Sequence, residues 1–202
     1  MSNTKTTNNT LNYYNSKATT FVSDTINVSF TSIQDTFLEY LPSHGTILDF
    51  GCGSGRDAKY FLSKGYSVDA IDGSGELCKI ASEFTGIPVK HMLFAELDET
   101  EKYDGIWACA SILHVEKDKL PDILEKMTNA LKTNGVIYAS FKNGEFEGEK
   151  NGRYFTYLTE ESFKELVKNI SHISIEKIWI TGDVREERGE ERWLNILLRK
   201  QA

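Results

Sequence analysis

Short, almost purely apolar runs recur along this chain and alternate with helix-like segments, and this alternation limits the fold more than any other feature. Runs typical of buried strands lie at 46–50, 66–72, 89–94, 105–110 and 136–141. Segments with apolar residues three and four positions apart, typical of helices, lie between them at 56–64, 75–84 and 121–132. Strands that carry apolar side chains on both faces belong to parallel sheets covered by helices on each side. We therefore predict an α/β fold with a doubly wound sheet.

The two ends of the chain depart from this alternation. The last apolar runs, 174–180 and 192–200, are separated only by an acidic turn, which we expect to be solvated. These runs are predicted to pair antiparallel, because a parallel return needs a longer crossover. Near the start, apolar residues at helical spacing predict one helix over 21–41. Residues 1–20 form a polar segment that is a possible lid, and its first residues, 1–10, predict a solvated, frayed terminus. The Gly- and Glu-rich stretch 143–152 predicts a loop.

Length and composition place the chain among ordinary globular proteins. Its 202 residues fit one domain covering 1–202, and contents of 40% hydrophobic and 26% charged residues argue against extended disorder. No apolar run reaches the ~18 residues of a membrane span, and the first residues lack a secretory signal, so we expect a cytoplasmic protein. A net charge of −7 disfavours general nucleic-acid binding, which needs clustered Lys and Arg. The three cysteines form no CxxC pair, so we expect neither a disulfide framework nor a metal site.

The strongest local signal is the segment LDFGCGSGRD at 48–57. Gly51, Gly53 and Gly55 lie between an expected buried strand and an expected helix, where glycine permits positive φ and lets a ligand approach the backbone. Asp72 ends the next strand, near the spacing of about 20 residues expected for an acid that binds ribose hydroxyls. The pattern predicts a nucleotide-type ligand. A tight turn with Asp72 as a helix cap is the alternative.

Two departures from the dinucleotide fingerprint indicate which nucleotide binds. Arg56 stands where the third glycine of an NAD site belongs. Asp49 precedes the first glycine by two residues, where a carboxylate repels a pyrophosphate but suits the ammonium group of a methionine moiety. A phosphate-binding Walker loop is excluded, because no Gly-Lys-Ser/Thr follows. These observations favour an aminoacyl nucleoside, and an NAD-linked oxidoreductase is the less favoured alternative.

These residues resemble the class I S-adenosylmethionine-dependent methyltransferases. The segment ILDFGCGSG looks like the first motif of that family, VDAID like its second-strand acid, YDGIWACASILHV like its fourth-strand segment and LKTNGVIYASF like its fifth. The resemblance extends from Tyr13 to Lys200. The runs SFKNGE and GRYF, with the closing WLNILLRK, look more narrowly like small bacterial members related to tellurite-resistance methyltransferases.

The resemblance implies a fold, a cofactor and a set of site residues. The fold is a Rossmann-like sheet of seven strands in the order 3-2-1-4-5-7-6, with strand 7 antiparallel, and the cofactor is S-adenosylmethionine. The implied cofactor-binding residues are Tyr14, Asp49, Gly51, Gly53, Gly55, Arg56, Asp72, Gly73, Ser74, Leu93, Phe94, Ala108 and Ala110. Asp49 is expected near the amino group, Asp72 at the ribose, and Leu93 beside the adenine. Many members carry an acid where Leu93 stands, so Glu96, Asp98 or backbone groups remain as replacements.

Methyl transfer from a sulfonium is a direct displacement, so the protein mainly supplies alignment and a suitable electrostatic setting. A general base is needed only when the acceptor loses a proton. His114 follows the fourth strand at the carboxyl edge of the sheet and is our candidate base, with a packed, backbone-bonded imidazole as the alternative. Tyr13 and Tyr14 are candidates for a lid over the cofactor, with an ordinary packing contact as the alternative.

A second group of residues, after the fifth strand, is expected on the same edge: Lys142, Arg153, Tyr154 and Phe155. A cation with aromatic neighbours suits an anionic or aromatic acceptor, and a solvated loop is the alternative. The sequence therefore predicts an S-adenosylmethionine-dependent methyltransferase for a small-molecule acceptor, with His114 and Arg153 in catalytic roles. A module that binds the cofactor without turnover is the alternative of another class.

Overall fold

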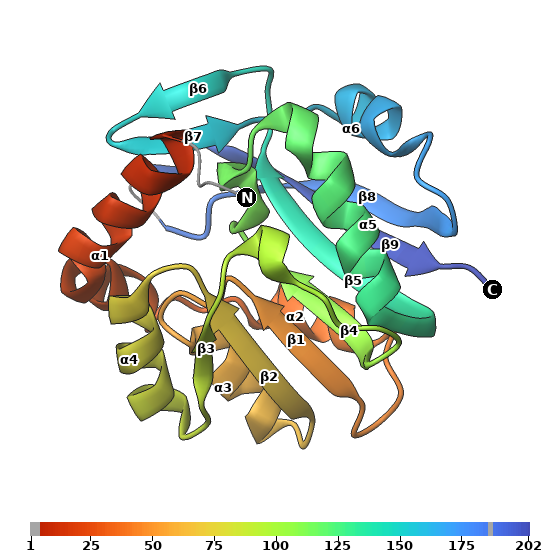
Figure 1. Cartoon of the computed structure of the whole chain (residues 1–202), viewed down its shortest axis with the longest axis horizontal. Coiled ribbons are helices and arrows are strands. Elements are labelled where there is room, and N and C mark those ends of the chain that lie inside the picture. Colours follow the sequence, from red (N-terminus) through yellow and green to blue (C-terminus); the bar gives the residue numbers. More distant parts are fainter. Residues whose placement is uncertain (1–4, 186–187) are drawn as a thin grey trace.

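The computed structural model describes residues 5–185 and 188–202 and has a seven-stranded sheet at its centre (Figure 1). The strands lie in the order β3-β2-β1-β4-β5-β9-β8. Their bounds are β1 Thr46–Phe50, β2 Ser67–Asp72, β3 Val89–His91, β4 Tyr103–Ala108, β5 Leu131–Lys142, β8 Ile173–Gly182 and β9 Arg192–Lys200. Strands β1 to β5 pair in parallel, whereas β9 is antiparallel to both β5 and β8. With β8 and β9 as its sixth and seventh strands, this sheet confirms the predicted order.

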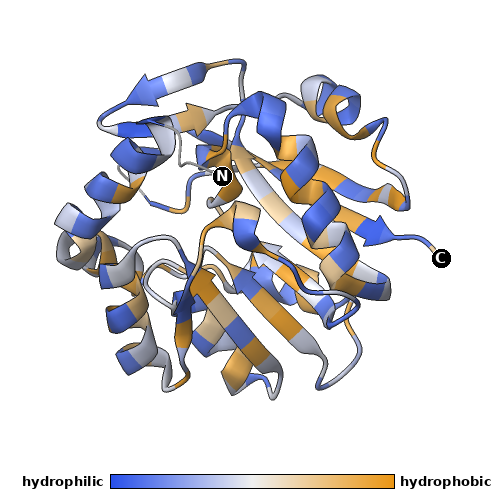
Figure 2. Ribbon diagram, in the orientation of Figure 1, coloured by the Kyte–Doolittle hydropathy of each residue, from blue (hydrophilic) through white to orange (hydrophobic). Residues whose placement is uncertain are grey.

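Helices cover both faces of the sheet. Their bounds are α1 Lys5–Thr25, α2 Thr31–Leu38, α3 Arg56–Ser63, α4 Gly75–Thr85, α5 Leu120–Ala130 and α6 Glu160–Val167. Alternate side chains of β1 point into two cores, so Leu48 packs with α5 and α6 while Ile47 packs with α2 and α3. Figure 1 shows α5 on one side of the sheet and α2 and α3 on the other. Figure 2 shows apolar residues concentrated along the central strands and hydrophilic residues over much of α1.

The start of the chain differs from the prediction in two ways. A single helix over 21–41 is wrong, because α1 ends at Thr25, residues 26–30 form a turn and an extended stretch, and α2 begins at Thr31. Ile26, Asn27, Val28 and Ser29 all have weak helix propensity, and this accounts for the break. A frayed terminus over 1–10 is also wrong from Lys5 onward, where α1 begins, and residues 1–4 lie outside the described part.

The stretch 143–152 also differs from the predicted loop. It leads into a two-stranded antiparallel hairpin, β6 Glu147–Lys150 with β7 Arg153–Thr156. Asn151 and Gly152 connect the strands with φ values of 54° and 78°. Two successive positive φ angles at an Asn-Gly pair form the turn that best matches the twist of a hairpin. Figure 1 shows the hairpin beside the start of α1, beyond the carboxyl ends of the central strands.

Two smaller expectations can be compared with the described residues. Within 5–185 and 188–202, no helix is long and apolar enough to cross a membrane. Cys52, Cys78 and Cys109 are free thiols.

Candidate active site

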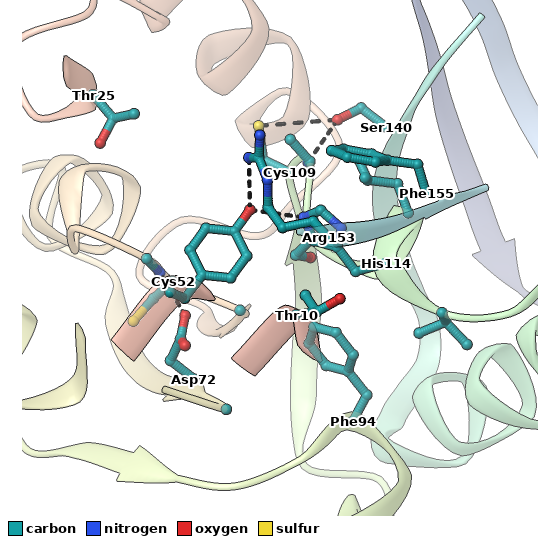
Figure 3. Close-up of a pocket in the computed structure, with 18 of the residues that line it drawn as sticks. Thr10, Thr25, Cys52, Asp72, Phe94, Cys109, His114, Ser140, Arg153 and Phe155 are labelled. Atoms are coloured by element: carbon teal, nitrogen blue, oxygen red, sulfur yellow. Dashed lines mark hydrogen bonds between the residues drawn. The ribbon is translucent and has the colours of Figure 1, made fainter. Parts of the chain in front are cut away.

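The carboxyl ends of the central strands open into a cavity of about 740 Å³, which is within the range of roughly 300–1,000 Å³ typical of small-molecule sites. In an open α/β sheet, ligands bind at this edge. Side chains of α1, β7 and the β8–β9 turn also line the cavity. Figure 3 shows Asp72 and Phe94 on one side of this space and His114, Arg153 and Phe155 on another.

The glycine loop after β1 brings bare backbone to the cavity. Gly51 and Gly53 line it, with φ values of 87° and 55°. A Cβ atom on Gly51 would lie 2.6 Å from the Cβ of Ser111, so no larger residue fits there without a shift. Gly55, expected to line the cofactor site together with Gly51 and Gly53, is not among the residues that line the cavity and packs against α4 instead. Its Cβ would lie 2.8 Å from Cγ2 of Thr85, so this glycine permits α3 and α4 to meet.

Asp72 ends β2 and lines the same part of the cavity, as predicted. Its carboxylate accepts hydrogen bonds from the amides of Gly53, at 2.9 Å, and Ser74, at 2.8 Å. Burial raises the pKa of Asp72, against the effect of these two hydrogen bonds. Gly73 lines the cavity beside it. Ser74 instead is fully buried, caps α4 through the amide of Leu77 and donates its hydroxyl to a side chain of α1.

Asp49, expected near the amino group of the cofactor, is not among the residues that line the cavity. Because successive side chains of a strand point to opposite faces, Asp49 lies on the α3 side of β1, where the Ala58 backbone is its hydrogen-bond partner. Burial raises its pKa well above the usual range, and the nearby carboxylate of Asp57 adds to this effect. On this side of β1, the carboxylate that lines the cavity is that of Asp57 rather than that of Asp49. Asp57 forms an ion pair of 2.8 Å with Arg56. Arg56 also lines the cavity, as predicted.

The segment after β3 forms another wall. Leu93 and Phe94 line the cavity as predicted, and the ring of Phe94 packs 4.7 Å from that of Phe50. Glu96 lines it too, although its carboxylate accepts a hydrogen bond of 2.8 Å from the Leu93 amide. Asp98 is exposed, so Glu96 is the better placed of the two replacement acids.

The segment after β4 contributes Cys109 and Ala110 to the cavity. Ala110 has a φ of 49°, and its amide donates to the hydroxyl of Ser140 at 2.8 Å. Ala108, predicted at the cofactor, is fully buried in the core beneath this segment.

His114 and Tyr14 form a hydrogen-bonded pair at the cavity wall. The Nδ1 atom of His114 lies 2.6 Å from the carbonyl oxygen of Tyr154. A carbonyl only accepts hydrogen bonds, so Nδ1 carries the proton and Nε2 does not. The hydroxyl of Tyr14, 2.7 Å from Nε2, therefore donates to it. Burial lowers the pKa of His114 to about 4, so the imidazole is neutral at pH 7.

Arg153 extends from β7 towards the same pair (Figure 3). Its guanidinium carbon lies 4.4 Å from the ring centroid of Tyr13 and 5.1 Å from that of Phe155. Its Nη1 atom lies 3.5 Å from the hydroxyl of Tyr14, and its Nε atom is buried without a hydrogen-bond partner. The expected meeting of His114 and Arg153 at one cavity is therefore present in the structure.

Sequence reasoning missed part of the cavity wall, the turn between β8 and β9. Asp183 and Arg185 of this turn and Trp193 at the start of β9 line the cavity, whereas the acidic composition of the turn predicts a solvated one. Burial alone would raise the pKa of Asp183, but hydrogen bonds from Arg185 and Trp193 hold it at about 2. Residues 186–187 of this turn lie outside the described part.

Residues 47–135 match the family model of a methyltransferase domain. This part of the chain is therefore similar to that family. An uncharacterized methyltransferase of Staphylococcus carnosus is 25% identical over 166 residues, which cover 74% of this chain and 79% of that protein.

Solved methyltransferases share the fold of the whole chain. A 1,6-didemethyltoxoflavin-N1-methyltransferase from Burkholderia thailandensis has a TM-score of 0.77 and 21% identity, over 95% of this chain and 87% of that one. TehB from Haemophilus influenzae has a TM-score of 0.70 and 18% identity, over 92% of this chain and 67% of that one. The former was solved with S-adenosylhomocysteine and its substrate bound. Together with the match of residues 47–135 and the bare backbone beside Asp72, this likeness is the basis for the cofactor that we propose below.

Proposed function

We propose that residues 1–202 form one domain that methylates a small-molecule acceptor held between the glycine loop, α1 and the β6–β7 hairpin. The observation that carries this proposal is the convergence of the Tyr14–His114 pair and Arg153 on the cavity that Asp72 and the glycine loop also line. An acceptor in this cavity would be largely enclosed, which favours a compound of low molecular mass over a macromolecular substrate.

We call the part of the cavity lined by the glycine loop, Asp72 and Phe94 the cofactor end. Its residues suit each part of S-adenosylmethionine. Bound there, the cofactor supplies an electrophilic methyl group on a sulfonium. Asp72 binds the ribose hydroxyls with the lone pairs that the Gly53 and Ser74 amides leave free. Leu93 and Phe94 border the adenine, and Ala110 lies beneath the methionine part. In this proposal Arg56 and Asp57 replace Asp49 as the charged groups nearest the glycine loop.

We call the part of the cavity lined by Tyr14, His114 and Arg153 the acceptor end. There, Tyr14 and His114 remove the proton that a hydroxyl or N–H acceptor must lose. The acceptor gives its proton to the Tyr14 oxygen while the Tyr14 proton passes to Nε2 of His114. As the acceptor takes up the methyl group that the cofactor would supply, the proton that the acceptor loses ends on Nε2 of His114. Arg153 stabilises negative charge on the Tyr14 oxygen, since it acts to lower the pKa of that hydroxyl against the effect of burial. Release of the proton to solvent is easy from an imidazole with a pKa of about 4.

The Tyr14–His114 pair also helps to decide whether the acceptor is a metalloid, as the resemblance to tellurite-resistance methyltransferases suggests. A reduced metalloid or a thiolate is methylated without a base, because it attacks through a lone pair that carries no proton. A neutral imidazole with its Nε2 turned to the cavity wall therefore favours an oxygen or nitrogen acceptor. The Burkholderia protein, named for methylation of a ring nitrogen, is a precedent for such an acceptor in this fold.

The test is a turnover assay that follows release of S-adenosylhomocysteine over a panel of acceptors. The panel contains phenols, heteroaromatic N–H compounds, amines, thiols, tellurite and selenite. We expect turnover with an oxygen or nitrogen acceptor and none with tellurite. Cofactor binding without turnover on any acceptor would favour a regulatory module, and turnover on tellurite or selenite would contradict the role of the pair.

A further inference from the structure

The cationic side chains around the cavity differ in how they are neutralised. Arg56 pairs with Asp57 at 2.8 Å, Lys142 with Glu191 at 2.5 Å, and Arg185 with Asp183 at 2.6 Å. Within 5–185 and 188–202, Arg153, Lys126 and Arg188 also line the cavity without a carboxylate partner. Lys126 donates to the Leu97 carbonyl at 3.1 Å, and Arg153 is the one of the three that lies beside the Tyr14–His114 pair. The aromatic rings of Tyr13, Tyr14 and Phe155 surround it instead.

The hydrogen-bonding capacity of Arg153 is largely unused. A guanidinium has five N–H donors in one plane. The described residues satisfy it with a single long contact, 3.5 Å from Nη1 to the hydroxyl of Tyr14, and its Nε atom is buried with no acceptor. A buried donor without a partner costs free energy, which a ligand that accepts from it would restore. Paired in-plane N–H groups match the two oxygens of a carboxylate.

The position of Arg153 relates this free cation to the acceptor end of the cavity. Its β7 neighbour Tyr154 holds the imidazole of His114 by its carbonyl group, and Tyr14 contacts both His114 and Arg153. The ring centroid of Phe155 lies within 6 Å of the guanidinium carbon of Arg153 and of the ammonium nitrogen of Lys142. Arg153 is therefore on the same side of the cavity as the end of β5. Figure 3 shows Arg153 and His114 together, with Asp72 apart from them.

We propose that Arg153 binds a carboxylate, or a comparable delocalised oxyanion, of the methyl acceptor, which is therefore a small organic acid. This inference rests on the proposed function, and it narrows the acceptor class within it. The acid is held beside Tyr14, so that its methylated oxygen or nitrogen lies within reach of the Tyr14–His114 pair. S-Adenosylmethionine also has a carboxylate, in its methionine moiety, that Arg153 could bind. The experiment must therefore distinguish the acceptor carboxylate from the cofactor carboxylate.

The acceptor arm of the experiment uses the protein saturated with S-adenosylhomocysteine and two matched probe pairs, benzoate with benzamide and acetate with acetamide. Calorimetry should show that at least one acid binds about 10- to 100-fold more tightly than its amide, the usual scale for a charge-assisted hydrogen bond. Arg153→Gln should remove this preference, and Arg153→Lys should keep part of it. Lys150→Gln, which removes an exposed charge from the same hairpin, is the matched control and should keep it fully. Equal binding of acid and amide, or a preference that survives Arg153→Gln, would overturn the proposal.

The cofactor arm compares S-adenosylhomocysteine with 5′-methylthioadenosine, which lacks the amino-acid part. Arg153→Gln should leave the affinity for both compounds unchanged. A loss confined to S-adenosylhomocysteine would assign Arg153 to the cofactor carboxylate and overturn the proposal. Failure of the wild-type protein to bind S-adenosylhomocysteine would instead contradict the cofactor assignment, so the two failures are distinguishable. The far-ultraviolet circular dichroism of each variant shows whether it has folded.

Discussion

Different kinds of groups line the two ends of the cavity. At the cofactor end, the wall is largely backbone and short side chains at the carboxyl ends of buried parallel strands, such as Gly51, Gly53 and Ala110. At the acceptor end, the wall consists of long side chains from α1, the hairpin and the β8–β9 turn. The central core fixes the first end, whereas the second depends on contacts between peripheral elements, such as the 3.0 Å bond from the Tyr154 amide to Thr10.

This difference indicates how the two ends respond to change. A wall made of core backbone cannot be altered without disturbing the sheet, so one cofactor site can serve many related proteins. A wall made of peripheral side chains can change with little effect on the core, and acceptor choice can vary on it. Substitutions at the acceptor end should therefore affect turnover more than stability, and substitutions at the cofactor end should affect binding or folding.

The largest effect is expected at the acceptor end, from His114→Ala. Removal of a general base lowers turnover by about 10²- to 10⁴-fold. The affinity for S-adenosylhomocysteine should stay within about twofold, because the imidazole contacts α1 and the hairpin rather than the glycine loop. Steady-state kinetics and calorimetry measure the two quantities. The exposed His44, replaced by Asn to suit its φ of 60°, is the matched control. A parallel fall in cofactor affinity would show that the two ends are not separable.

The next effect contrasts two glycines of the same loop. Gly55→Val forces a β-branched residue to a φ of 79° and against Thr85, which should cost about 2–4 kcal/mol of unfolding free energy. Gly53→Val is also strained, at a φ of 55°, but its Cβ meets only the ring of Phe21 on α1, at 3.0 Å, so it should lose less stability than Gly55→Val and more cofactor affinity. Denaturant unfolding and calorimetry on both variants test this contrast. Equal loss of stability in the two variants would contradict it.

Asp72→Ala is expected to weaken binding of S-adenosylhomocysteine by about 1.5–3 kcal/mol, the scale of hydrogen bonds to a charged group. The fold should survive, although the Gly53 and Ser74 amides lose their acceptor. Asp72→Asn keeps one acceptor oxygen and should lie between Ala and wild type. An unchanged affinity in a folded Asp72→Ala protein would remove this residue from the site.

The smallest effect is a pH dependence that comes from His114. Its pKa falls from 6.5 in the unfolded chain to about 4 in the folded protein because of burial. The unfolded state therefore takes up the proton first as the pH falls, and stability present above pH 6.5 is lost towards pH 4. Between pH 7 and pH 5 the loss should be about 2 kcal/mol at most. Unfolding of wild type and His114→Gln at both pH values measures it, and an identical pH dependence in the two proteins would contradict the assignment.

The same contrast explains what the sequence could predict. The parallel strands, the glycine loop and Asp72 follow local rules of apolar patterning and spacing, so their positions were predictable to within a few residues. Asp49 shows the limit of such rules, because the alternation of side chains along β1 turns it towards α3. A motif position alone did not reveal which face of the strand it occupied.

The acceptor end was harder to predict because it is assembled by docking. Asn151-Gly152 is a recognised hairpin signal, but its flanking strands lack the apolar alternation that would have supported it. The polar α1 has no continuous apolar stripe, and its contacts with Tyr154 and His114 lie more than 90 residues away in sequence. Its packing therefore follows from tertiary contacts that no local pattern records.

The position of α1 has a kinetic consequence. Leu11 lies over Gly73 and Phe21 over Gly53, while Thr10 and Tyr14 bond to the hairpin and to His114. One helix thus covers both compartments of the cavity. Both products would therefore lie beneath the same helix before they leave. We expect the two products to have linked residence times and the undocking rate of α1 to set the ceiling on turnover.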